Sequence, residues 1–277
     1  MSRLGKLFTD LKSRSEAALV AFLVGGDPDA GRSFAFLEAL VEGGADIIEV
    51  GFPFSDPLAD GKVIQEGCQR ALSTSTTPAQ VLEMVKRLRE RHEVAVVLFS
   101  CFNLLLQYGL EAFAKDATKV GADAVLVTDL PPEEGREWWE IAHKEGLDTI
   151  FLVSSTNRPE RIREIANLSS GFIYGISRMG VTGARSELPA DLPEFMGRLK
   201  GLTDLPIAVG FGISTPEHVK QVCAVADGAV VGTALVDLTT RSTPEELKDF
   251  VRSLKAATCA ADEKGSRAQK RVSSGRK

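Results

Sequence analysis

The 277-residue sequence has few of the residues on which the commonest metal, disulfide and acid–base sites depend. It contains three histidines and four cysteines, and the cysteines never form a Cys-x-x-Cys pair. Such spacing predicts neither a zinc site nor a disulfide framework and is typical of reduced thiols. No apolar run approaches the roughly 20 residues that cross a bilayer. We therefore expect no metal site and no membrane span.

Acidic residues outnumber basic ones, so the formal net charge is −5. This balance argues against a general nucleic-acid or acidic-membrane binder. Residues 264–277 carry six basic and no acidic residues, and subtracting this +6 leaves −11 for the rest. We interpret residues 259–277 as a basic, disordered tail. A solvated extension is the preferred interpretation, and a nucleic-acid or partner-binding arm is the alternative. Met1–Lys6 holds no apolar signal core, so the cytoplasm is the expected compartment.

Short β-branched, apolar runs recur along the chain and alternate with helical patterns. They are apolar almost throughout, which indicates strands buried on both faces, as in a parallel sheet. The expected strands are Ala18–Val24, Ile47–Gly51, Val94–Phe99, Ala124–Thr128, Thr149–Val153, Phe172–Ile176, Ile207–Val209 and Ala229–Gly232. Eight such units predict a single (β/α)₈ TIM barrel over residues 1–258. A doubly wound open sheet is the alternative, but it explains eight similar units less well.

Helix boundaries follow from proline and glycine. Six prolines lie near expected first helical turns, and four of them follow an N-cap candidate: Asp27, Thr77, Thr215 and Thr243. The segments Gly44–Ile48 and Gly121–Val125 both read Gly-Ala-Asp-apolar-apolar, and Ala226–Val230 is a looser copy. We interpret this repeat as a glycine-closed helix end followed by a strand. Ser2–Arg14 is an expected extra helix across the barrel bottom.

The active site of a barrel lies at the carboxyl ends of its strands. His92, His143 and His218 fall in or at the ends of expected helices, which disfavours a histidine metal site or a Ser-His-Asp triad. No lysine lies inside an expected strand, as a Schiff-base aldolase would require.

Carboxylates remain as the candidates for acid–base chemistry. Glu49 lies inside an expected buried strand, where its charge is costly unless the group is paired or protonated. A salt-bridged core glutamate is the alternative, but a raised pKa would suit Glu49 to proton transfer near neutrality. Asp56 and Asp60 follow in the next loop as helix caps or as a second active-site carboxylate, whereas Asp129 reads as a turn residue.

Three glycine-rich segments follow the last three expected strands: Gly180–Gly183, Gly210–Ser214 and Val231–Ala234. In many barrels such loops bind a phosphate through backbone N–H groups at a helix N-terminus. Glycine lets the backbone approach the anion closely. The sequence thus predicts a phosphorylated substrate despite the acidic composition.

Ile48–Gly61, which reads IEVGFPFSDPLADG, strongly resembles the signature of the tryptophan synthase alpha chain family. Gly26–Pro28, Gly180–Gly183 and Gly210–Ser214 match further blocks, and the similarity runs from about Leu4 to Ala257. The resemblance implies retro-aldol cleavage of indole-3-glycerol phosphate to indole and D-glyceraldehyde 3-phosphate, in the last steps of L-tryptophan biosynthesis. The block PFSDPLADG disfavours another phosphate-binding barrel, such as an isomerase of the histidine or tryptophan pathways.

The resemblance also implies roles for individual residues. Glu49 would protonate indole C3 and assist deprotonation of the glycerol 3′-hydroxyl, and Asp60 would accept the indole N1–H. The indole and glycerol pocket would consist of Phe22, Phe99, Leu126, Thr128, Leu152, Tyr174 and Thr182. The phosphate site would consist of Gly183, Phe211, Gly212, Gly232 and Thr233.

The family implies a partner as well: a pyridoxal-phosphate beta chain in an αββα heterotetramer, which receives indole through a tunnel. No cofactor is then expected in this chain itself. Ala21, Lys62, Cys101 and Ser154-Ser155 depart from the usual family pattern, but none replaces a proton-transfer group. Two alternatives stay open: a stand-alone lyase that releases free indole, and a catalytically silent subunit that only activates a beta chain.

Overall fold

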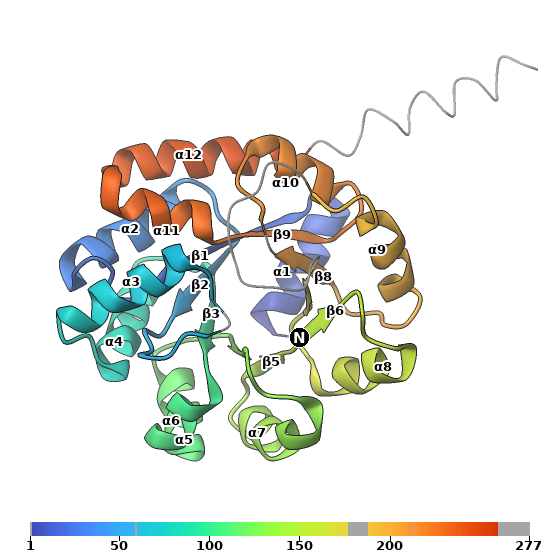
Figure 1. The fold of residues 1–277 in the computed structure, drawn as a ribbon, viewed down its shortest axis with the longest axis horizontal. Coiled ribbons are helices and arrows are strands. Elements are labelled where there is room, and N and C mark those ends of the chain that lie inside the picture. Colours follow the sequence, from blue (N-terminus) through green and yellow to red (C-terminus); the bar gives the residue numbers. More distant parts are fainter. Residues whose placement is uncertain (1, 59, 177–187, 211, 260–277) are drawn as a thin grey trace, which may run out of the picture.

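The computed structural model describes residues 2–58, 60–176, 188–210 and 212–259. Within them, nine parallel strands form one sheet in the order β5-β4-β3-β2-β1-β9-β8-β7-β6. The outermost two, β5 (Asp148–Ile150) and β6 (Leu152–Ser154), are consecutive in the chain, so the sheet nearly closes on itself at Phe151. The result is a barrel of eight units whose fifth strand is interrupted, with helices around it (Figure 1). This confirms the predicted (β/α)₈ barrel and excludes the alternative of an open sheet. One expected strand, Thr149–Val153, is split into β5 and β6.

The remaining elements match the expected alternation closely. The other strands are β1 (Ala18–Val24), β2 (Ile47–Gly51), β3 (Ala95–Ser100), β4 (Ala124–Val127), β7 (Ile173–Ile176), β8 (Ile207–Gly210) and β9 (Gly228–Val231). The helices are α1 (Arg3–Ser13), α2 (Ala30–Glu42), α3 (Lys62–Ser73), α4 (Pro78–Arg89), α5 (Phe102–Tyr108), α6 (Leu110–Lys119), α7 (Pro132–Lys144), α8 (Pro159–Leu168), α9 (Leu192–Lys200), α10 (Pro216–Cys223), α11 (Thr233–Arg241) and α12 (Pro244–Ala256), followed by a short 3₁₀ turn, Ala257–Cys259. No helix in the described ranges is long and apolar enough to span a membrane.

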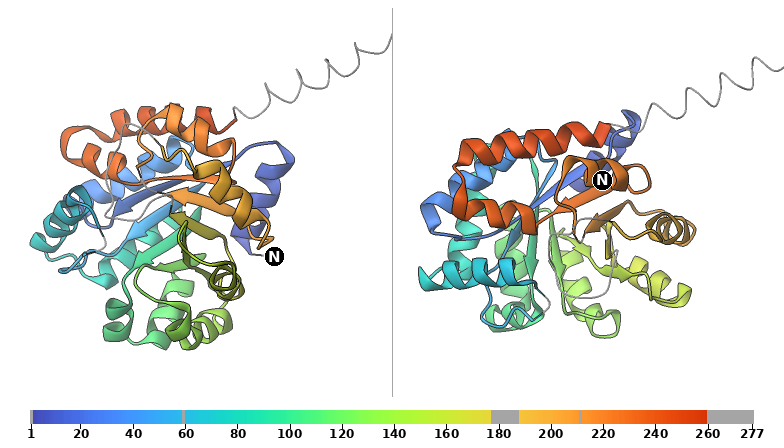
Figure 2. Two further views of the ribbon diagram at one scale, coloured as in Figure 1. Left: turned by 45° about the vertical axis from the view of Figure 1, so that its right-hand side comes forward. Right: turned by 45° about the horizontal axis from the view of Figure 1, so that its top comes forward.

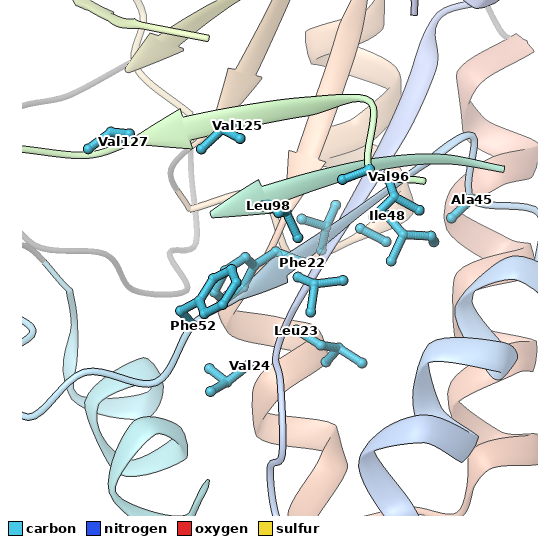
Figure 3. Packing of buried hydrophobic residues seen from close by; sticks show 14 of the residues in the cluster. Phe22, Leu23, Val24, Ala45, Ile48, Phe52, Val96, Leu98, Val125 and Val127 are labelled. Carbon is cyan, nitrogen blue, oxygen red and sulfur yellow. The ribbon is translucent and has the colours of Figure 1, made fainter. Parts of the chain in front are cut away.

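Buried side chains form two layers because successive residues of a strand point to opposite faces. The outer layer fills the space between the sheet and the helices, and Figure 3 shows part of it, including Ile48, Val96 and Leu98. The inner layer fills the barrel lumen with residues such as Ile47 and Val97. The near-continuous apolarity of the strands therefore reflects burial on both faces, as expected.

The predicted N-terminal helix, α1, seals one end of the lumen (Figures 1 and 2). Leu4, Phe8 and Leu11 lie one turn apart, are buried, and belong to the lumen cluster. The ring of Phe8 packs 5.8 Å from that of Phe172. An amphipathic helix thus closes the barrel opposite the carboxyl ends of the strands.

The Gly-Ala-Asp repeat has a structural role beyond closing helices. Gly44 and Gly121 have φ values of +94° and +85°, as a glycine-closed helix end requires. In each copy the aspartate exchanges two hydrogen bonds with the start of the neighbouring strand: its backbone N–H donates to a carbonyl, and its side chain accepts from the N–H of the same residue. The pairs are Asp46 with Leu19 (side-chain bond 2.7 Å), Asp123 with Val96 (2.8 Å) and Asp227 with Ile207 (2.9 Å).

Basic side chains neutralise the first two of these aspartates. Lys255 Nζ lies 2.8 Å from Asp46, and Arg89 lies 3.0 Å from Asp123, which also pairs with Arg3. Because carboxylates shielded from water are costly without partners, Asp46 and Asp123 each tie strand, helix and neighbouring strand together.

The expected helix caps are correct in three of four cases. Thr77, Thr215 and Thr243 cap α4, α10 and α12 through side-chain hydrogen bonds. The fourth expectation is wrong, because Asp29 caps α2 and Asp27 does not. The side chain of Asp27 instead turns inward to an ion pair with Arg70, for which the local sequence gives no signal.

We predict that Asp123→Ala lowers the free energy of unfolding by about 2–4 kcal/mol, because it leaves the Val96 N–H without its side-chain acceptor and Arg89 without its counter-charge. Asp123→Asn should cost less, since it keeps an acceptor for Val96. Urea titration measures both, with the exposed Glu90→Ala as the control. A loss below ~0.5 kcal/mol for Asp123→Ala, typical of a surface change, would contradict the role of this repeat.

Candidate active site

Glu49 lies in the middle of β2, aligned with Phe22 on β1 and Val97 on β3. The strand alternation that sends Ile47 into the lumen sends Glu49 there too. The side chain is 0% exposed, and neither carboxylate oxygen has a hydrogen-bond partner among the described residues. Burial raises the pKa of Glu49 to about 8. The salt-bridged alternative is thus not what the structure shows, and Glu49 stays largely protonated at neutral pH.

Asp60 approaches from the loop between β2 and α3. Its backbone N–H donates to the Pro57 carbonyl at 3.0 Å, and Gln65 Nε2 donates to the Asp60 carbonyl at 2.8 Å. These bonds fix the end of the loop against the first turn of α3. Burial raises the pKa of Asp60 to about 6. Asp56, the other candidate in this loop, is exposed and accepts a hydrogen bond from Ser55 Oγ at 2.7 Å.

A small cavity of about 40 Å³ brings the two carboxylates together at the mouth of the barrel. Aromatic rings bound it: those of Phe22 and Phe99 lie 4.9 Å apart in an edge-on arrangement, and Tyr174 adjoins them. Burial, together with the charges of Glu49 and Asp60, raises the pKa of the Tyr174 hydroxyl well above its ordinary value. The complete lining comprises Phe22, Glu49, Asp60, Ile64, Phe99, Tyr174, Gly212, Ile213, Val230, Gly232 and Thr233.

Glycine makes room for this aromatic wall. A Cβ on Gly210 would lie 2.3 Å from the Tyr174 hydroxyl oxygen, and one on Gly51 would lie 2.8 Å from the Phe22 ring. Both glycines end strands next to the site. Their absence of a side chain is therefore a packing requirement as well as a means of approaching an anion.

Some predicted pocket residues lie elsewhere. Leu126 is buried in the lumen cluster, aligned with Phe99. Thr128 and Leu152 line a separate cavity of about 340 Å³ beside Asp129. Asp129 itself lies in a turn, as expected, and its side chain also accepts from the backbone N–H of Phe102 at 2.6 Å. Three further predicted residues lie outside the described residues: Thr182, Gly183 and Phe211.

The lining also includes residues that sequence reasoning missed. Ile64 comes from the first turn of α3, and Ile213 and Val230 come from the last two units of the barrel. A single apolar residue in a helix or strand carries no signal that separates pocket lining from core. Only the four-residue step from Asp60 to Ile64, about one helical turn, could have drawn attention to Ile64.

A larger cavity of about 650 Å³ adjoins the first, and Thr233 lines both. Its wall includes Lys62, Arg241, Asp237 and Glu246, which are charged groups of both signs, and lacks a buried carboxylate. The smaller cavity therefore carries the acid–base groups, and the larger one extends the Thr233 end toward solvent.

The histidines do not enter this site. His218, in the first turn of α10, lies nearer to it than the sequence indicates, because its Nδ1 accepts from the Ser214 N–H at 3.4 Å. It nevertheless does not line the cavity, and His143 stacks on Trp139 in α7. Within the described ranges, no three His, Cys, Asp or Glu side chains form a set that could hold a metal ion.

Comparison with known proteins is decisive for the family. The family model for the tryptophan synthase alpha chain matches residues 8–265. The chain belongs to the tryptophan synthase alpha chain family. It is 46% identical to the alpha chain of Geobacter sulfurreducens, over 93% of this chain and 99% of that one. It is 47% identical to the alpha chain of Citrifermentans bemidjiense, over 92% and 97%.

Solved structures agree with this assignment. A chain of Mycobacterium tuberculosis tryptophan synthase superposes with a TM-score of 0.88 at 38% identity, covering 93% of this chain and 98% of that one. The alpha subunit of Legionella pneumophila tryptophan synthase gives 0.83 at 35% identity, covering 93% and 98%. The chain is therefore an alpha subunit of tryptophan biosynthesis and a lyase that cleaves indole-3-glycerol phosphate.

The raised pKa of Glu49 makes a prediction about stability. Between pH 4.5 and pH 8 the folded state keeps a proton on Glu49 that the unfolded state releases, so the stability of the wild type falls as pH rises through this window. Glu49→Gln removes this cost, and its stability advantage should be smallest below pH 4.5 and largest above pH 8, at most about 5 kcal/mol.

Thermal unfolding of both proteins across this pH range measures the effect. Glu90→Gln, an exposed change, serves as the control and should follow the wild type throughout. A Glu49→Gln curve parallel to that of the wild type would show that Glu49 titrates normally.

Proposed function

We propose that Glu49 and Asp60 together perform the proton transfers of the retro-aldol cleavage. Glu49 starts protonated and delivers its proton to C3 of the indole ring. The resulting carboxylate takes the proton of the glycerol 3′-hydroxyl as the bond between C3 and the glycerol carbon breaks. Indole and an aldehyde are released, and Glu49 ends protonated again. The observation that supports this proposal most is that the Glu49 carboxyl is fully buried and has no hydrogen-bond partner among the described residues. Its pKa of about 8 suits both steps.

Asp60 stabilises the charge that this step creates. Protonation at C3 makes the ring nitrogen electron-poor, so N1–H becomes a stronger donor. An ionised Asp60 accepts this hydrogen bond and offsets the developing positive charge. A pKa of about 6 leaves Asp60 mostly ionised at neutral pH, while Glu49 in the same cavity is mostly protonated. Two carboxyls in one cavity thus take opposite roles.

The apolar side chains would hold the indole ring between the carboxyls. Phe22 and Tyr174 provide flat, buried surfaces and Phe99 a half-buried one, and such rings stack at centroid distances of 4.5–7 Å. We propose that Leu126 supports this wall from below, and that Thr128 and Leu152 lie at its edge, with Thr182.

The opposite end of the cavity would bind the phosphate. Gly212, Gly232 and Thr233 line it, and α11 begins at Thr233 with its N-terminal N–H groups unsatisfied within the helix. Such a helix end attracts anions. This mode needs no cationic side chain, which reconciles an acidic protein with a phosphorylated substrate. Gly183 and Phe211 are proposed members of the same site.

We further propose that the chain works with a pyridoxal-phosphate beta chain in an αββα heterotetramer, that it carries no cofactor of its own, and that it is cytoplasmic. The loop that carries Asp60 also presents Leu58, an 85% exposed side chain, and Leu106 in α5 is 52% exposed. Large exposed apolar groups at the active-site end support a partner surface there. The free thiols of all four cysteines fit a reducing compartment.

We predict that Glu49→Gln lowers indole formation from indole-3-glycerol phosphate by at least about 10³-fold, because glutamine can neither donate nor accept the proton. Asp60→Asn should be severe but less complete. The assay measures indole release by the purified chain, with Asp56→Asn, an exposed neighbour in the same loop, as the control. Near-normal cleavage by Glu49→Gln would overturn the mechanism.

The same assay with and without a pyridoxal-phosphate beta chain separates the alternatives. A rise in cleavage rate on adding the beta chain supports the heterotetramer, whereas an unchanged high rate identifies a stand-alone lyase. If the chain cleaves no substrate under either condition but still raises the activity of the beta chain, it is a catalytically silent subunit.

The two pKa values predict a bell-shaped pH profile of kcat/KM. Activity should fall below about pH 6 as Asp60 becomes protonated, and above about pH 8 as Glu49 loses its proton. Initial rates at low substrate concentration from pH 5 to 9 measure this profile. Asp60→Asn should lose the acidic limb and keep the basic one, so an acidic limb unchanged in that variant would contradict the assignment.

A further inference from the structure

The buried carboxylate of Asp27 contacts two helices. Its side chain is 1% exposed. Arg70 on α3 binds it with both ends of the guanidinium: Nε donates to Oδ1 at 2.7 Å and Nη2 to Oδ2 at 2.8 Å. Thr239 Oγ1 on α11 lies 3.2 Å from Oδ2 and 2.8 Å from the Val236 carbonyl oxygen, so the two acceptors share its proton. One carboxylate in the loop after β1 therefore holds both helices at once.

The packing around Asp27 leaves no room for a side chain at two nearby glycines. A Cβ on Gly67 of α3 would lie 3.1 Å from Asp27 Oδ2 and 3.1 Å from the side chain of Val236 on α11. A Cβ on Gly26, the residue before Asp27, would collide with Thr76 at 2.2 Å. The helices α3 and α11 thus contact each other at Gly67. The loop that carries Asp27 packs against α3 and against Thr76.

Both helices carry one end of the candidate site. α3 directly follows the Asp60 loop and supplies Ile64 to the cavity, whereas α11 begins at Thr233, the proposed phosphate end. Thr239 is six residues from Thr233, or about 9 Å along a rigid helix. On α3, the pKa of the Cys68 thiol is raised to about 11, mainly by burial, and the charges of Asp60 and Asp27 both add to the rise.

We propose that Asp27 is a positioning residue which, through Arg70 and Thr239, fixes the Asp60 end of the active site relative to the Thr233 end. This inference rests on the proposed roles of Asp60 and Thr233. A bound substrate spans both ends, so its indole nitrogen meets Asp60 only when the two helices keep their separation. Misplacement by about 1 Å can cost a factor of 10² in rate.

Asp27→Asn tests the proposal, because the amide cannot accept from Arg70 with both of its atoms. We expect kcat for cleavage to fall about 10- to 100-fold, with KM changed less than threefold, since the phosphate end stays intact. The matched control is Asp46→Asn at the other end of the barrel. Asp46 also pairs with a cation, Lys255 at 2.8 Å, and accepts from a backbone N–H. We expect it to lose comparable thermal stability while kcat stays within twofold of the wild type.

Thr239→Val and Thr239→Ser provide a second pair for the case in which Asp27→Asn fails to fold. Valine keeps the shape but removes the hydroxyl, and serine restores it. We expect kcat to fall about three- to tenfold in Thr239→Val and to recover in Thr239→Ser. Rates are compared at a temperature at which circular dichroism shows every variant to be folded.

Equal kcat losses in Asp27→Asn and Asp46→Asn would show that Asp27 contributes only stability and would overturn the proposal. Wild-type kcat in Thr239→Val would also overturn it. These outcomes differ from failure of the proposed function, in which the wild type itself makes no indole or Glu49→Gln remains active.

Discussion

A closed parallel sheet sends every second side chain into a lumen that has no access to water except at its ends. Apolar side chains of the described strands fill this lumen, and α1 closes the end opposite the site with Leu4, Phe8 and Leu11. Glu49 lies at a lumen-facing position of β2, is fully buried, and has no hydrogen-bond partner on either oxygen among the described residues. Its pKa near 8 is a consequence of barrel closure. The chemistry of the site thus depends on the same constraint that builds the fold.

The carboxyl groups of this protein differ in role because the fold places them in different surroundings. Asp123 and Asp46 are also shielded from water, but backbone N–H groups and cations surround them, and they hold strands and helices together. Asp60 reaches the cavity from a loop and is only half-buried, so its pKa rises less than that of Glu49. Similar side chains therefore act as structural anchors or as acid–base groups according to the partners that the fold supplies.

Sequence patterns predicted local structure well where the cause is local. Strand positions follow from continuous apolar runs, and Thr77, Thr215 and Thr243 cap helices because the side chain bonds its own helix. Asp27 has the same local pattern, yet Asp29 takes the cap and Asp27 pairs with Arg70, 43 residues away. The interruption of the fifth strand at Phe151 also has no local signal.

The candidate site divides in the same way. By itself the sequence determined that the chain alternates strands with helices, that Glu49 occupies a buried strand, and that glycine-rich segments follow the last strands, because these properties depend on residue type and spacing. The family resemblance predicted Asp60 as the second carboxylate, but only the tertiary structure decided that Ile64 and Val230 line the cavity while Leu126 does not, and that Asp27 links α3 to α11. These facts depend on distances between segments far apart in the chain, which are set when the sheet closes and the helices pack against it.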